Sequence, residues 1–149
     1  MEFKEINKNL FDLEGEYTLV HCISKDCEMG AGIAKEFVKR YPGIKDHNKE
    51  AIKNMGRKTI LDGINIFYKK DNFSVISIVT KGKFWSKPTI DSMQAALTEL
   101  KFQCFIRNIN KLAMPTIGCG LDKLKWKTVK QLIKDTFEDM DLEIVICHK

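Results

Sequence analysis

Short runs of β-branched and aromatic residues recur along the chain and predict strands. Residues 17–23, YTLVHCI, are apolar almost throughout and predict a buried strand. The same pattern predicts further strands at 3–6, 59–61, 64–68, 74–79, 112–114 and 142–147, with a turn at 70–72. Because these segments are short and separated by polar or glycine-containing stretches, they indicate a sheet built from many strands.

Helices are predicted where apolar residues recur at spacings of three and four. One helix is expected to open at Gly30–Gly32 and to end near Pro42, a weaker one covers 44–55, and another covers 126–137. The longest follows Thr89, which can cap it, and one apolar face is formed by Ile90, Met93, Leu97, Leu100 and Cys104. Strands alternate with helices in the second half, which predicts an α/β fold with a largely parallel sheet. We expect one domain over residues 1–149.

Two loops are candidates for ligand binding because each follows a predicted strand and leads into a helix. They are residues 24–32, SKDCEMGAG, and residues 116–122, TIGCGLD. Ligands of α/β proteins bind beyond the carboxyl ends of strands, so neighbouring parallel strands would place both loops on one edge. Gly118 and Gly120 would let backbone N–H groups approach a phosphate closely. The alternative is a tight turn that binds nothing.

Several single residues allow two interpretations. Asp122 could act in a site or cap the following helix. Lys81 ends a predicted strand, where an exposed lysine is the ordinary outcome. Phe84 and Trp85 lie in a loop and could stack on a base, although packing over the core is the favoured interpretation. For the lysines around residues 123–130, a solvated helix face is the favoured interpretation.

Composition narrows the class of protein. The chain is 44% hydrophobic and 30% charged, and it has no apolar run of about 20 residues that could span a membrane. The N-terminal residues lack the apolar segment of a secretory signal. Five cysteines at irregular spacing predict reduced thiols, and no metal-ligand set accompanies Cys22 and Cys27. We expect a cytoplasmic protein, or a nuclear one in a eukaryote, that is neither secreted nor bound to a membrane.

Positive charge is concentrated in one part of the chain. The net charge is +5, but residues 81–130 contain ten basic and three acidic residues, an excess of seven. Such an excess favours a polyanionic ligand, namely a nucleotide, a polyphosphate or a nucleic acid. A solvated lysine surface is the alternative.

Taken together, these segments resemble a macrodomain, most closely the subclass of terminal ADP-ribose protein glycohydrolases. The motifs that support the resemblance are HCIS at 21–24, MGAGIA at 29–34, Thr80-Lys81, KPT at 87–89 and MPTIGCGLD at 114–122, followed by Leu124 and Trp126. The resemblance implies a three-layer α/β/α sandwich around a mixed, largely parallel sheet, with ADP-ribose in a cleft across its edge.

The resemblance also implies a reaction. Lys81 matches the catalytic lysine and Asp122 the catalytic aspartate of the subclass. The lysine would attack the distal ribose, displace an acidic side chain and form a lysyl-ADP-ribose intermediate that the aspartate helps to resolve. The residues expected to bind ADP-ribose are Asn9, Leu10, Ser24, Met29, Gly30, Gly32, Ile33, Thr116, Ile117, Gly118, Cys119, Gly120 and Leu121. Related macrodomains also deacetylate O-acetyl-ADP-ribose.

The expected partners are ADP-ribose and ADP-ribosylated proteins or nucleic acids, bound by a monomer with no cofactor and no metal. Asn9 stands where many macrodomains have an aspartate that accepts a bond from the adenine amino group, and an amide oxygen can still accept it. Two alternatives to a protein-directed hydrolase remain. One is a reader that binds ADP-ribose without cleaving it, and the other is an eraser of ADP-ribose on DNA, as in toxin–antitoxin macrodomains.

Overall fold

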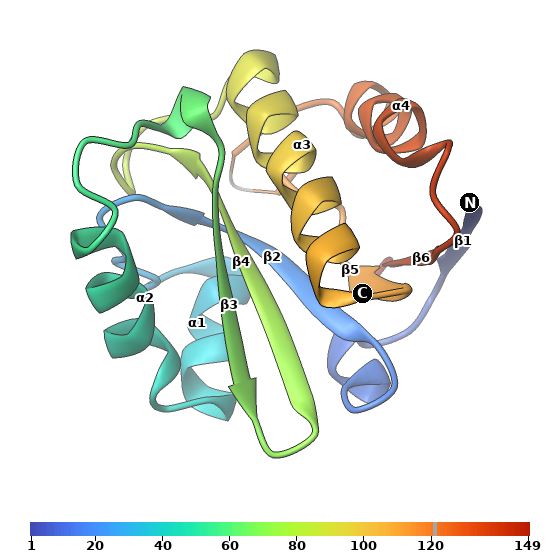
Figure 1. Ribbon diagram of the computed structural model, residues 1–149, viewed down its shortest axis with the longest axis horizontal. Helices are drawn as coiled ribbons and strands as arrows, with labels where there is room; N and C mark the ends of the chain where they lie inside the picture. The colour runs from blue at the N-terminus through green and yellow to red at the C-terminus, as the bar shows by residue number, and fades with distance from the viewer. Residues whose placement is uncertain (121) are drawn as a thin grey trace.

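A single sheet forms the middle layer of the molecule (Figure 1). The computed structural model describes residues 1–120 and 122–149, and within them six strands pair in the order β1-β6-β5-β2-β4-β3. The strands are β1 (Glu2–Ile6), β2 (Thr18–Ser24), β3 (Ile64–Lys70), β4 (Phe73–Lys81), β5 (Lys111–Met114) and β6 (Glu143–Cys147). All neighbouring pairs are parallel except β3 with β4, which are antiparallel.

Helices cover both faces of the sheet. Helices α1 (Gly32–Arg40) and α2 (Ile44–Lys53) lie on one face, and α3 (Ile90–Arg107) and α4 (Trp126–Phe137) lie on the other (Figure 1). Alternate residues of β2 point into the two layers. Leu19 packs in the core that contains Phe37 of α1, whereas Val20 packs in the core that contains Leu97 of α3. The predicted α/β fold with a mixed, mostly parallel sheet is therefore confirmed.

Two local predictions are wrong. Ile90 was expected on the buried face of α3, but it is 39% exposed at the first position of the helix. Residues 59–61 were expected to form a strand, but the chain forms the 3₁₀ helix η2 (Ile60–Asp62). The Asp62 carboxylate accepts bonds from the backbone N–H of Thr59 at 2.6 Å and from its hydroxyl at 3.1 Å, which favours a turn over an extended segment.

The order of the strands decides which loops meet. β5 and β4 flank β2, and both run parallel to it, so the segments that follow these three strands leave the same edge of the sheet. The predicted meeting of the loops at 24–32 and 116–122 is confirmed, and the segment after Lys81 joins them. Across the described residues, no helix is long and apolar enough to cross a membrane.

Candidate functional site

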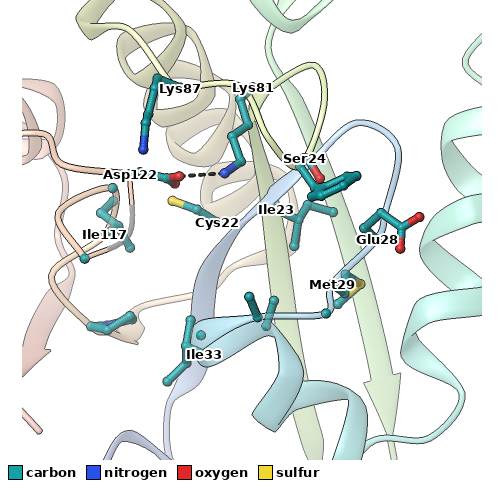
Figure 2. Close-up of a pocket in the computed structure, with 18 of the residues that line it drawn as sticks. Cys22, Ile23, Ser24, Glu28, Met29, Ile33, Lys81, Lys87, Ile117 and Asp122 are labelled. Atoms are coloured by element: carbon teal, nitrogen blue, oxygen red, sulfur yellow. Dashed lines mark hydrogen bonds and ion pairs between the residues drawn. The ribbon is translucent and has the colours of Figure 1, made fainter.

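A cleft of about 850 Å³ opens where these three segments meet (Figure 2). One wall is formed by the loop between β2 and α1, another by the loop between β5 and α4, and the third by the segment between β4 and α3. This volume lies in the range of cavities that enclose most of a small organic ligand.

Lys81 and Asp122 form an ion pair that lines the cleft. The Lys81 Nζ atom donates to the Asp122 Oδ1 atom at 2.6 Å, and the two side chains are only 14% and 16% exposed (Figure 2). Lys81 is thus not the exposed strand-end lysine of the alternative interpretation. Asp122 does not cap α4 either, because the residue at the N-cap is Lys125.

The loop between β2 and α1 brings several predicted binding residues to the cleft. Ser24, Met29, Gly30, Gly32 and Ile33 all line it. Positive φ angles at Met29 (49°) and Gly32 (59°) turn the chain sharply into α1. No side chain caps this helix, so its first N–H groups are available to an anionic ligand in the cleft.

The opposite wall is a glycine turn. Thr116, Ile117, Gly118 and Gly120 line the cleft. Gly118 has a φ of +73°, and its carbonyl accepts a bond from the N–H of Leu124 at 2.8 Å, which closes the turn. Around Gly120, by contrast, a Cβ atom would find no protein atom within 4 Å, so this position faces open space.

Three of the predicted binding residues that the structure describes do not line the cleft. Cys119 is half-buried, and its Sγ atom donates to the carbonyl of Ile117 at 3.3 Å. Leu10 is 2% exposed and belongs to the core. The Asn9 Oδ1 atom accepts from the N–H of Phe11 at 2.9 Å and so caps the 3₁₀ helix η1 (Leu10–Leu13). Leu121 lies outside the described residues.

The cleft also contains side chains that the sequence did not assign to it. Phe84 and Trp85 line it and are 58% and 70% exposed, so the expectation that they pack over the core is wrong. Glu28 also lines the cleft. Its position in the loop after β2, which was predicted to bind a ligand, could have indicated this. Cys22 lies beneath the ion pair, where burial raises the pKa of its thiol to about 12 and keeps it protonated (Figure 2).

Fold and cleft together are those of a macrodomain. The model of the Macro domain family matches residues 20–133, and the chain belongs to this family. The human protein "ADP-ribose glycohydrolase OARD1" is 35% identical over 141 residues, which cover 95% of this chain and 88% of that protein.

Bacterial relatives share the fold. The "DNA ADP-ribosyl glycohydrolase" of Mycobacterium tuberculosis is 29% identical over 141 residues, and the match covers 91% of this chain but 38% of that longer protein. The solved macrodomain of Mycobacterium tuberculosis DarG superposes with a TM-score of 0.86 at 25% identity, covering 99% of this chain and 97% of that one.

Proposed function

We propose that this chain is an ADP-ribosyl glycohydrolase that binds ADP-ribose in the cleft and cleaves the bond at its distal ribose. The observation that carries the proposal is the contact between Lys81 and Asp122 at 2.6 Å, inside a cleft walled by two glycine loops. The loops suit a diphosphate, and the ion pair suits bond cleavage beside it. Relatives with 35% and 29% identity are named as glycohydrolases of ADP-ribose and of ADP-ribosylated DNA. Residues 1–149 act as one macrodomain in this proposal.

Lys81 acts as the nucleophile. Its ammonium group first loses a proton to solvent, so that the neutral amine is free to react, and the Asp122 carboxylate beside it stays ionised for the second step. The amine then attacks the anomeric carbon of the distal ribose. A carbon–nitrogen bond forms, and the bond from that carbon to the oxygen of the modified group breaks, with the electron pair leaving on that oxygen. Water displaces the lysine in a second step, with Asp122 as the general base, and releases ADP-ribose.

A glutamate side chain is our first choice of leaving group, because a carboxylate accepts the departing electron pair readily. The second candidate is a base of DNA. It is favoured by Phe84 and Trp85, whose exposed rings line the cleft and could stack on a base, and which belong to the stretch 81–130 with its excess of positive charge.

One assay tests the proposal and separates the candidates. The protein is incubated with a protein mono-ADP-ribosylated on glutamate and, in parallel, with a single-stranded oligonucleotide ADP-ribosylated on thymidine. Release of ADP-ribose from either substrate supports a hydrolase and identifies the leaving group. Binding of free ADP-ribose with no release from either would instead identify a reader.

A further inference from the structure

The Asp26 carboxylate joins two walls of the cleft. One of its oxygens, Oδ1, accepts from the Ser24 hydroxyl and from the N–H of Glu28 at 3.3 Å, both within the loop that follows β2. The other oxygen, Oδ2, accepts from the N–H of Phe84 at 2.9 Å, in the segment that follows β4. The carboxylate therefore joins its own loop to Phe84, which lies 58 positions further along the sequence.

Backbone bonds bring the two segments alongside each other first. The N–H of Lys25 donates to the carbonyl of Lys81 at 2.9 Å, and the N–H of Asp26 donates to the carbonyl of Gly82 at 3.3 Å. The pairing of β2 with β4 thus continues past both strand ends and stops at Gly82. Beyond that point, the Asp26 side chain provides the next connection along the segment.

The segment that Asp26 holds is a small turn over residues 83–86, and packing against the core does not hold it in place. The N–H of Ser86 donates to the carbonyl of Lys83 at 3.0 Å, which closes the turn on itself. Phe84 and Trp85 at its tip are 58% and 70% exposed, so packing contributes little to their placement. Their position over the cleft instead depends on hydrogen bonds to the rest of the protein.

The hydrogen bond from the Phe84 N–H to the Asp26 side chain is charge-assisted. Partial burial acts to raise the pKa of Asp26, but bonds from Ser24, Phe84 and Glu28 keep this pKa below its ordinary value. The group is therefore a carboxylate at neutral pH, and hydrogen bonds to charged acceptors are about twice as strong as those between neutral groups.

We propose that Asp26 is a positioning residue that holds Phe84 and Trp85 against the group leaving from the distal ribose. The role rests on the proposed function, because it places Phe84 and Trp85 on the side of the cleft from which the leaving group departs. Lys81 lines the cleft together with these two residues. Asp26 contributes to recognition of the conjugated substrate and not to that of free ADP-ribose, which lacks the leaving group.

Asp26→Ala tests this role because it removes both acceptor oxygens. An amide at this position could still accept from the Phe84 N–H and donate to the Ser24 hydroxyl, so it would not remove the connection. Asp62→Ala is the matched control, because Asp62 also bonds a loop N–H, that of Thr59, and does not line the cleft. Melting temperatures of both variants establish that they fold.

Two readouts are expected to change in Asp26→Ala and not in Asp62→Ala. Hydrogen exchange of the Phe84 amide, followed by NMR, should accelerate at least roughly tenfold, since its acceptor is lost. The KM for the conjugate that the unmodified protein cleaves should rise about tenfold, the factor expected for one charge-assisted bond, while the Kd for free ADP-ribose stays within about twofold. In a Trp85→Ala background, Asp26→Ala should add little, because both changes remove the same contact.

An unchanged exchange rate at Phe84 would overturn the proposal. So would faster exchange with an unchanged KM, or equal losses of affinity for conjugate and free ADP-ribose, which would reduce Asp26 to general support of the cleft. If the unmodified protein cleaves neither conjugate, the proposed function fails and the positioning role fails with it. The exchange measurement still reports separately whether Asp26 holds the turn.

Discussion

Gly118 and Gly120 lie two residues apart in one loop, yet their substitution should have opposite consequences. Gly118 has a φ of +73°, and an added Cβ would lie 2.7 Å from the Met93 methyl and 3.0 Å from Leu124. The left-handed backbone costs an alanine about 1 kcal/mol. The Met93 methyl is the end of a flexible chain, but Met93 is fully buried, so moving it repacks the core at a further cost of about 1–3 kcal/mol.

Gly118→Ala is therefore expected to lose about 2–4 kcal/mol of stability. For a chain of this size, that corresponds to a fall of roughly 4–16 °C in melting temperature. Gly120→Val should leave the melting temperature nearly unchanged, because nothing lies within 4 Å of the added Cβ. It should nevertheless abolish binding of ADP-ribose, because the side chain would occupy the space proposed for the diphosphate.

Differential scanning fluorimetry with and without ADP-ribose measures both effects. The unmodified protein should melt at a higher temperature in saturating ADP-ribose, because a ligand that binds the native state stabilises it. Gly120→Val should melt like the unmodified protein without ligand and should show no shift with it. A Gly120→Val variant with the full shift would refute the placement of the diphosphate, and a Gly118→Ala variant of unchanged stability would refute the strain argument.

Three further predictions concern stability and reactivity. Burial lowers the pKa of His21 to about 3, whereas an unfolded histidine titrates near 6.5, so the unfolded chain binds more protons between these values. Stability should thus fall with the pH in this window, by about 2 kcal/mol from pH 7 to pH 5, and urea titrations should show a flatter dependence for His21→Gln. Thr89→Ala should cost about 1 kcal/mol in the same titrations, because it removes the side-chain bond to the N–H of Ser92 that caps α3. Iodoacetamide at pH 8 should label Cys22 much more slowly than a free thiol, although this half-buried residue lines the cleft, because desolvation raises the pKa of its thiol to about 12. Rapid labelling would contradict the raised pKa.

Periodicity predicted the layers of the fold because strands and helices bury faces at different spacings. The segment 126–137 was predicted with the bounds that α4 has, since its apolar residues recur regularly. Residues 59–61 were mispredicted because two consecutive β-branched residues favour a strand, whereas the bond that decides the local structure comes from Asp62. A side-chain bond of this kind leaves no periodic signal.

The parts of the site that directly follow strands could be predicted from the sequence. The edge shared by the two glycine loops followed from parallel strands, and the structure brings Lys81 and Asp122 together there. The role of Asp26 could not be read from the sequence, because its partner at Phe84 is 58 residues away. The exposure of Trp85 was missed because an aromatic residue in a loop usually packs against the core.

In the proposed reaction, Lys81 attacks the distal ribose and Asp122 resolves the lysyl adduct. Intact mass spectrometry of Asp122→Ala, after incubation with a protein ADP-ribosylated on glutamate, distinguishes this reaction from direct hydrolysis, and peptide mapping locates any adduct. We expect one ADP-ribosyl group to accumulate on Lys81 in Asp122→Ala. In Lys81→Ala, no adduct forms and no ADP-ribose is released, although free ADP-ribose still binds. Continued cleavage by Lys81→Ala would contradict the role of Lys81 as the nucleophile and would indicate direct attack by a water molecule that Asp122 activates.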